Sequence, residues 1–349
     1  MKSKDTNFSR RSFIGKTATI AAGITLAGTK VWGAPNYIPG LLTPNSKING
    51  VQLGLITYSF RAMKDQSAEA ILQYVVECGI SGIELMGGTA ESFNGRPENK
   101  IDRRKYYSML RKERKKSLTQ EEEKEFKDLK SQMASYEKEV EEWNKTRSLD
   151  GFTKLRKMYN DAGVDIYAFK PDYLLTAKNS DANINYAMQA GKILGASHVT
   201  LELPRNSSHT LKLGQMAKKN GIYVAYHGHE QQNPTWWDTA LNQSSFNAMN
   251  LDLGHYTAAG NTDALDLIQN KNQNIMSMHV KDRQNPANGK KNVSFGKGDT
   301  PIKEVLQLMR DNKYNFAATI EYEYDTPADS SIINEIKKSV AYCKNALES

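Results

Sequence analysis

Histidines and acidic residues follow short apolar runs in the second half of the chain. The stretch YVAYHGHEQQ (223–232) ends one such run with His227 and His229, and the next run, AMNLDLGH (248–255), carries Asp252 and His255 at its end. Imidazoles and carboxylates are the groups that bind divalent metals, and they also move protons in catalysis. These four residues therefore indicate a metal centre, an acid–base site, or both in one place.

The same pattern continues along the chain. Four of the six histidines fall at the ends of three consecutive runs, whereas His198 and His209 lie outside the pattern and are interpreted as structural or exposed. The other charged residues at run ends are Glu84, Lys170, Glu202, His279, Lys281, Asp282, Glu321 and Glu323. A single carboxylate or lysine at such a position is often only a surface group, and for Lys170 a solvated lysine is the plainer interpretation. Asp252, His279 and Glu321 on successive runs favour a site.

The runs themselves predict the fold. Eight of them are found, at 51–59, 79–87, 164–171, 196–204, 222–229, 248–255, 275–282 and 316–324. Several are almost continuously apolar, which is typical of parallel strands covered on both faces, and amphipathic helical segments separate them. Eight strand–helix repeats predict an α/β protein with a (β/α)8 barrel over 51–345. An open sheet is the alternative, but no strand is followed by a GxGxxG motif.

A barrel of this kind places the ends of all its strands at one face, where active sites are built. The charged run ends would then converge on one another. Because side chains alternate along a strand, His227 and His229 should point to the same side, as should His279 and Lys281. One residue of each pair can then bind metal while the other meets the substrate.

One long segment interrupts the repeats. Residues 95–150, after the second strand, are polar, rich in charge and helix-prone, and Thr119 precedes a glutamate-rich helix start. We expect a solvated helical hairpin. The alternatives are a coiled-coil partner site and a roof over the barrel mouth that shapes the substrate site.

The first residues resemble an export signal. Residues 1–33 combine basic residues, including the pair Arg10–Arg11, with the apolar stretch TATIAAGITLAG (17–28). That stretch is too short to span a bilayer, and the arginine pair is similar to a twin-arginine signal. We expect cleavage after Gly33, a linker over 34–50, a periplasmic location and no membrane span once the signal is removed.

Charge and cysteine content narrow the function further. Residues 1–33 carry +5 of the net charge of +8, and the remaining +3 forms no basic stripe, which argues against a nucleic-acid partner. The two cysteines, Cys78 and Cys343, predict two buried thiols, with one disulfide as the alternative. Neither suits a thiolate zinc site.

Taken together, the motifs resemble the xylose isomerase-like barrel superfamily of sugar phosphate isomerases and epimerases. The resemblance covers about residues 50–345 and rests on GIELMGG, AYHGHE, LDLGHYTAAG, MHVKDR, FGKGDTPI and IEYEY. It implies one divalent ion, Mn, Co, Mg or Zn, held by ligands from the last four strands. By resemblance, Asp252, His279 and Glu321 take three of the places. Family epimerases have glutamate at the remaining place, and this chain has His227 there, so either His227 or Glu202 is the fourth ligand.

The resemblance also implies roles for the neighbouring residues. His229, His255 and Lys281 match positions that line the substrate in family members that carry out dehydrations, and Glu84 is a further acid–base candidate. The residues expected to contact substrate are Lys170, Trp236, Arg283 and Glu323. Trp236 and Trp237 form a pair that either stacks on a sugar or packs in the core.

These features lead to one hypothesis and three rivals. An exported protein meets unphosphorylated sugars, and the YHGH motif and the inserted helices resemble the inosose dehydratase and 3-keto-glycoside lyase branch. The hypothesis is metal-dependent enolisation of a keto-sugar followed by β-elimination of the glycosidic bond. It implies an exported oxidoreductase that makes the keto-sugar. The rivals are a sugar isomerase or epimerase, a non-catalytic periplasmic sugar-binding protein, and a nuclease similar to endonuclease IV.

Overall fold

A computed structural model describes residues 43–349 of the chain. The predicted signal segment 1–33 and most of the predicted linker lie outside the described residues. Eight parallel strands form a closed ring in which each strand pairs with the next and the last pairs with the first. The strands of the ring are β2 (Val51–Ile56), β3 (Gly82–Met86), β4 (Asp165–Lys170), β5 (His198–Glu202), β6 (Tyr223–His227), β7 (Asn247–Asp252), β8 (Ile275–Val280) and β11 (Ala317–Ile320).

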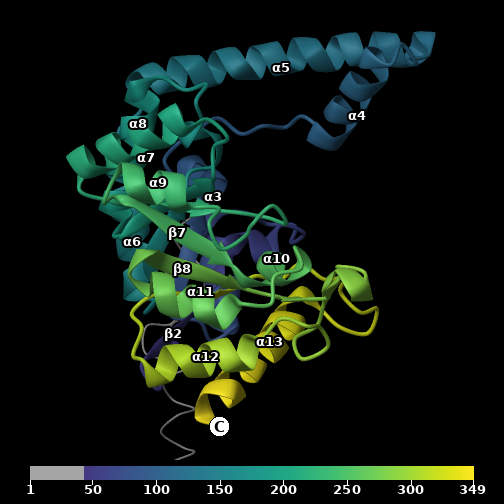
Figure 1. Ribbon diagram of the computed structural model, residues 1–349. Helices are drawn as coiled ribbons and strands as arrows, with labels where there is room; N and C mark the ends of the chain where they lie inside the picture. The colour runs from purple at the N-terminus through teal and green to yellow at the C-terminus, as the bar shows by residue number, and fades with distance from the viewer. Residues whose placement is uncertain (1–42) are drawn as a thin grey trace, which may run out of the picture. The chain divides into compact units, whose positions relative to one another are not determined.

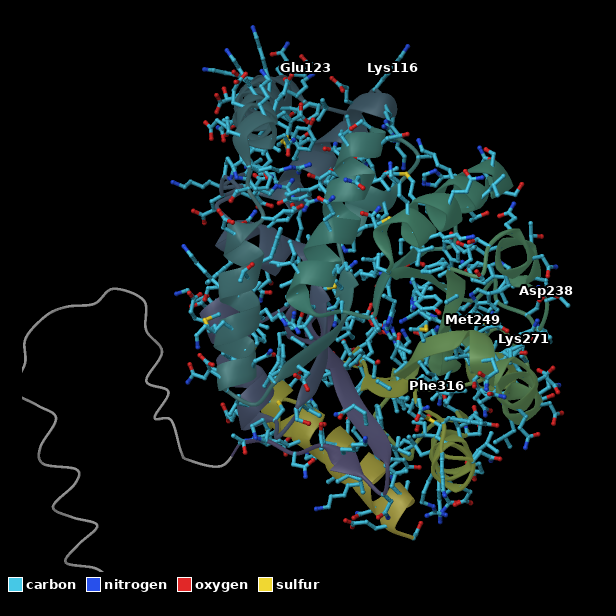
Figure 2. The ribbon with its side chains drawn as sticks, turned by 90° about the vertical axis from the view of Figure 1, so that its left-hand side faces the viewer. Lys116, Glu123, Asp238, Met249, Lys271 and Phe316 are labelled. Carbon is cyan, nitrogen blue, oxygen red and sulfur yellow. The ribbon has the colours of Figure 1, made fainter. Side chains whose placement is uncertain are left out.

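Helices follow the strands and surround the ring, as Figure 1 shows. They are α2 (Ala68–Glu77), α3 (Gly87–Phe93), α6 (Asp150–Asp161), α7 (Asp181–Leu194), α8 (Ser207–Asn220), α9 (Asp238–Gln243), α10 (Leu253–Ala258), α11 (Ala264–Lys271), α12 (Ile302–Asp311) and α13 (Ile332–Glu348). Ion pairs join some of these helices at the surface, such as Lys271 of α11 with Asp238 of α9 (Figure 2). The prediction of a (β/α)8 barrel is confirmed.

Glycine residues make possible the short turns that return the chain from a helix to the next strand. Helices α7 and α8 end at Gly195 and Gly221, which have φ values of 93° and 65°. A residue with a side chain rarely adopts this left-handed conformation, so glycine allows the helix to stop and the next strand to begin within two or three residues. These short turns keep the strand ends in register at the opposite face, where the longer loops lie.

The predicted insertion is a pair of helices between β3 and α6, α4 (Arg103–Arg114) and α5 (Gln120–Thr146). Thr119 and Glu122 form a reciprocal capping box at the start of α5, as its sequence predicts. Three lysine–glutamate ion pairs link the two helices, for example Lys130 with Glu113 at 2.8 Å. Lys116 and Glu123 lie at the end of the hairpin where the helices are joined (Figure 2).

Three short strands lie outside the ring, and four 3-10 helices, at Thr57–Phe60, Asp172–Leu175, Asn272–Asn274 and Pro286–Asn288, complete the described structure. Strand β1 (Lys47–Ile48) pairs with β2, and β9 (Asp282–Arg283) pairs with β10 (Asn292–Val293) beyond the end of β8. Asp282 accepts backbone N–H groups from Gly296 and Gly298, so it holds the FGKGDT loop in place and is not part of a site. Cys78 and Cys343 are free and buried, as predicted. None of the described helices is both long and apolar enough to cross a membrane.

Candidate metal centre and histidine pair

The structure brings four of the predicted metal ligands together at the ends of β6, β7, β8 and β11. His227, Asp252 and His279 each offer one ligand atom, and these atoms all lie within 4.8 Å of one another. Glu321 Oε2 lies 3.2 Å from His279 Nδ1. All four side chains are nearly or fully buried, with no more than 7% of the side chain exposed. We refer to His227, Asp252, His279 and Glu321 as the buried centre.

Asp252 shows how the local structure prepares this centre. Its Oδ1 accepts the backbone N–H of His255 at 2.6 Å and so caps helix α10. Its Oδ2 is buried and makes no hydrogen bond of acceptable geometry, although Lys281 Nζ lies 3.0 Å away. Burial raises the pKa of Asp252, because the charged form of its carboxyl group loses hydration at this position. A buried carboxylate oxygen without a hydrogen bond is costly, and a cation would stabilise it.

Both histidines of the buried centre are held by the ring nitrogen that faces away from it. His227 Nδ1 lies 2.8 Å from Asn250 Oδ1, and His279 Nε2 lies 2.7 Å from Glu84 Oε2. The amide group of Asn250 points its nitrogen at Ser277 and Glu84, so its oxygen must be the atom that accepts from His227. Each outer nitrogen therefore donates a proton, which leaves His227 Nε2 and His279 Nδ1 as the ring atoms that can bind a metal.

The donor set fits a divalent cation. His227 Nε2 and His279 Nδ1 both lie 3.8 Å from Asp252 Oδ2. Ligands bound to one ion at about 2.0–2.2 Å are roughly 3–4 Å apart, and two imidazoles with two carboxylates suit zinc, manganese or cobalt. The four residues of the buried centre would hold the ion, and His227 is the fourth ligand that this geometry favours.

Glu84 stands behind His279 and does not face the mouth. Its carboxylate is fully buried and also accepts the hydroxyl of Thr200 at 2.5 Å. Burial alone would raise its pKa, but the charge and hydrogen bond of His279, with Lys170 and Thr200, lower the pKa to about 2. In the described structure this carboxylate is fully buried and orients His279, and the role of Glu84 as an acid–base residue stays a prediction.

Glu202 lies apart from the buried centre. Its side chain is 49% exposed, with Oε2 3.3 Å from His229 Nδ1 and Oε1 3.3 Å from Lys170 Nζ. Its carboxylate faces His229 and Lys170 and is not among the grouped metal-type ligands of the described residues, and the alternative that Glu202 is a metal ligand stays a prediction. For Lys170, burial would lower the pKa, but Glu202 and Glu84 outweigh it and raise the pKa.

Lys281 is surrounded by acids. Its Nζ lies 2.9 Å from Glu321 Oε2, 2.6 Å from Glu323 Oε2 and 3.0 Å from Asp252 Oδ2. Burial would lower its pKa, but the three carboxylates outweigh it and raise the pKa. All three N–H groups have a carboxylate oxygen nearby, so Lys281 compensates the charge of these acids, and its contact with a substrate oxyanion stays a prediction. Glu323, predicted to contact substrate, is placed as its partner.

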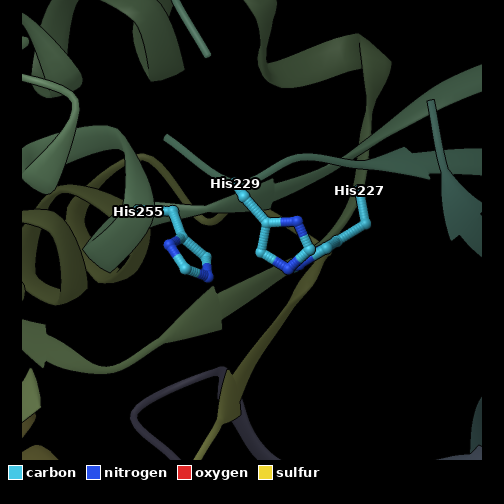
Figure 3. Close-up of side chains that lie close together, drawn as sticks. All are labelled: His227, His229 and His255. Atoms are coloured by element: carbon cyan, nitrogen blue, oxygen red, sulfur yellow. The ribbon is translucent and has the colours of Figure 1, made fainter. Parts of the chain in front are cut away.

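Above the buried centre, the rings of His229 and His255 meet edge to face with centroids 4.5 Å apart. Figure 3 shows the two side chains next to each other. We refer to them as the histidine pair. His229 follows the end of β6 and is exposed, and its Nδ1 faces the Glu202 carboxylate. Because a carboxylate only accepts, His229 Nδ1 carries a proton and Nε2 is left free to accept one.

His255 is held by a cation, whereas His229 is held by a carboxylate. The guanidinium of Arg283 donates to His255 Nδ1, and Arg283 is itself held by Glu230 at 2.8 Å. Burial, followed by the charges of Lys281 and Arg283, lowers the pKa of His255 to about 2, so it stays neutral. A neutral imidazole that accepts at Nδ1 carries its proton at Nε2 and is therefore a donor. Arg283, predicted to bind substrate, is 6% exposed and acts through His255.

A polar layer that the run-end pattern does not predict lies beneath the buried centre. Thr200, Asn250 and Ser277 are fully buried and hydrogen-bonded to Glu84, His227 or one another. His198 joins this layer through Ser277, which confirms its interpretation as structural. A signal was available, because each of the three lies two residues before a predicted site residue and so points to the same side of its strand.

Comparisons with known proteins agree with this architecture. A family model described as xylose isomerase-like TIM barrel matches residues 72–346. No curated protein matches the chain. Among solved structures, a sugar phosphate isomerase/epimerase from Parabacteroides distasonis is similar at 17% identity with a TM-score of 0.53, covering 84% of this chain and 93% of that one.

Two further structures share the fold. A probable 3-DHS dehydratase, AsbF, from Bacillus anthracis has 16% identity and a TM-score of 0.55, covering 83% of this chain and 98% of its own. The IOLI protein, whose structure holds a zinc atom, has 13% identity and a TM-score of 0.54, covering 85% and 98%. At such identities the likeness concerns the fold.

Proposed function

Because the chain belongs to the xylose isomerase-like TIM barrel family, we propose that it enolises a non-phosphorylated keto-sugar and eliminates the substituent β to the ketone, which cleaves a 3-keto-glycoside. The observation that carries the proposal is the histidine pair directly above the buried centre. One imidazole can accept a proton at Nε2, the other can donate a hydrogen bond from its Nε2–H group, and four metal-type ligands lie beneath them.

The residues divide the work according to their hydrogen bonds. His227, Asp252, His279 and Glu321 would hold one divalent ion, which as a Lewis acid would stabilise negative charge on the ketone oxygen. His229 Nε2 would take the proton from the carbon between the ketone and the glycosidic carbon. Glu202 at 3.3 Å from Nδ1 stabilises the imidazolium that forms.

The elimination then balances without an oxidant. The electron pair of the broken C–H bond becomes a carbon–carbon double bond, and the bond from the glycosidic carbon to the leaving oxygen breaks. His255 Nε2–H donates a hydrogen bond to the oxygen on which charge develops. The leaving oxygen takes up the proton of the His229 imidazolium and departs as the alcohol, which returns the pair to its starting state.

Two alternatives share parts of this site. A sugar isomerase or epimerase would use the same buried centre and reprotonate the enolate, and two of the similar structures carry names of that kind or of dehydratases. A non-catalytic sugar-binding protein would not need four metal-type ligands brought together in the barrel. The pairing of one fixed acceptor with one fixed donor favours elimination over a two-base epimerisation.

The proposed substrate depends on where in the cell the protein works. The signal-like segment 1–33 supports export to the periplasm, where unphosphorylated glycosides are the available substrates. An exported oxidoreductase that converts the glycoside to its 3-keto form is then required upstream. The experiment that tests the proposed activity is incubation of the metal-loaded protein with a 3-keto-glucoside, with the release of the leaving group followed by mass spectrometry.

A further inference from the structure

A groove lies beside the loop that carries His229. It has a volume of about 540 Å³ and lies between the loops that follow β5 and β6. Its walls include Leu203, Pro204, Arg205, Gln231, Trp236 and Thr239. Both loops are at the carboxyl ends of their strands, so the groove belongs to the face of the barrel that carries the site.

The groove and the histidines share a backbone segment. Trp236 packs directly on Gly228, the residue between His227 and His229: a Cβ added there would lie 2.4 Å from Trp236 Cζ3. On the other strand, Leu203 N donates to the carbonyl of His227 at 3.0 Å. The groove wall at Trp236 is therefore in contact with the residue that directly precedes the acceptor His229.

The wall of the groove is rigid at Trp236. Its ring meets Trp237 edge to face, with centroids 5.0 Å apart and an interplanar angle of 82°. Trp237 is fully buried and donates its Nε1 proton to the carbonyl of Tyr226 at 2.9 Å. Trp236 itself is only half-buried. A fixed, partly exposed indole is suited to stacking on the apolar face of a ring.

Polar donors stand beside the indole. Arg205 and Gln231 are exposed, and within residues 43–349 neither side chain makes a hydrogen bond or an ion pair. Their N–H groups are free to donate to hydroxyl oxygens at the edge of a stacked ring. An indole face with adjacent donors matches a pyranose, which has an apolar face and a hydroxylated rim.

We propose that this groove is a subsite for the leaving group of the glycoside and that it takes a second pyranose ring stacked on Trp236. The proposal rests on the proposed function, since elimination requires a leaving group held beside His229. Its ligand chemistry is nevertheless independent of the reaction, because neither the ketone nor the ion contributes to the groove. Equilibrium binding therefore tests it separately.

The test uses the full chain treated with EDTA and titrated with cellobiose, methyl β-glucoside and phenyl β-glucoside by calorimetry. Cellobiose is expected to bind about tenfold more tightly than methyl β-glucoside, as one added stacking contact of about 1.4 kcal/mol would give. Trp236→Ala should remove that difference, and Trp143→Phe, which changes an indole on α5, should preserve it. Equal affinities of cellobiose and methyl β-glucoside for the unaltered protein would overturn the proposal, and phenyl β-glucoside binding more tightly than cellobiose would replace the pyranose by an aromatic ring.

Two exposed positions keep the test decisive if Trp236→Ala does not fold. Arg205→Ala and Gln231→Ala should each weaken cellobiose binding two- to fivefold without changing the affinity for methyl β-glucoside, as the loss of one hydrogen bond would. An unchanged preference for cellobiose in both variants would overturn the proposal. Failure of the proposed function would appear elsewhere, as selective cellobiose binding without cleavage of any 3-keto-glycoside.

Discussion

The buried centre and the histidine pair use the same residue type for different purposes, and the difference lies in what stands behind each ring. In the buried centre, Asn250 and Glu84 accept from the outer nitrogens, so the inner nitrogens are the ring atoms left to bind a metal. In the histidine pair, one ring is backed by a carboxylate and the other by a guanidinium. The hydrogen-bond partner, more than the histidine itself, therefore sets the chemistry of each ring.

The largest expected effect is a loss of metal affinity in the buried centre. Asp252→Asn retains a side-chain oxygen that can cap α10, but it removes the charge that faces His227 and His279. We expect affinity for Mn²⁺ or Co²⁺ to fall by more than about 100-fold, since the loss of a charged ligand exceeds the effect of a supporting residue. Calorimetry measures the affinity, and Asp311→Asn on the surface is the matched control. Unchanged metal binding in Asp252→Asn would remove Asp252 from the buried centre.

His229→Gln should have the opposite profile. The metal affinity is expected to stay within about threefold of the original value, whereas kcat should fall by about 10²–10⁴-fold, the usual contribution of a general base. Steady-state kinetics and calorimetry on the same preparation measure both quantities. A loss of metal binding in this variant would show that the two regions are not separate.

Glu84→Gln tests whether the Glu84 carboxylate supports His279 as a metal ligand. Glutamine can still accept from His279 Nε2, but the negative charge is lost, so His279 should become a weaker ligand. We expect metal affinity to fall by about 10- to 100-fold, the range seen for residues that support metal ligands. The absorption spectrum of bound Co²⁺ reports the change in ligand field directly. An unaltered spectrum and affinity would mean that Glu84 contributes only to folding.

The pH dependence of metal binding tests the same contact. Burial would lower the pKa of His279, but Glu84 and Glu321 outweigh it and raise the pKa to about 10 in the metal-free protein. Below that pH the ring carries a second proton, which the metal must displace from Nδ1. Affinity should therefore rise with pH, by about tenfold per unit between pH 6 and 9 for one proton released. Calorimetry in two buffers of different ionisation enthalpy counts the protons, and a count of zero contradicts this contact.

The sequence identified the barrel and most of the residues around its mouth, because strand ends must converge in a (β/α)8 fold. It could not assign their roles. Glu84 and His279 are 195 positions apart in the sequence. Only the closed ring of strands shows that the Glu84 carboxylate holds the His279 imidazole. Lys281 and Arg283 were expected to meet substrate, yet their partners Glu323 and Glu230 engage them. Such pairings depend on side-chain directions that the spacing of residues does not contain.

The central claim is that the buried centre and the histidine pair together eliminate a leaving group from a keto-sugar. The most direct measurement incubates the metal-loaded protein with a 3-keto-glucoside and follows the products by mass spectrometry. We predict release of the free leaving group together with an unsaturated or hydrated keto-sugar, lost after EDTA treatment and in Asp252→Asn. An intact glycosidic bond, with deuterium exchanged from solvent beside the ketone, would contradict elimination and assign the site to isomerisation or epimerisation.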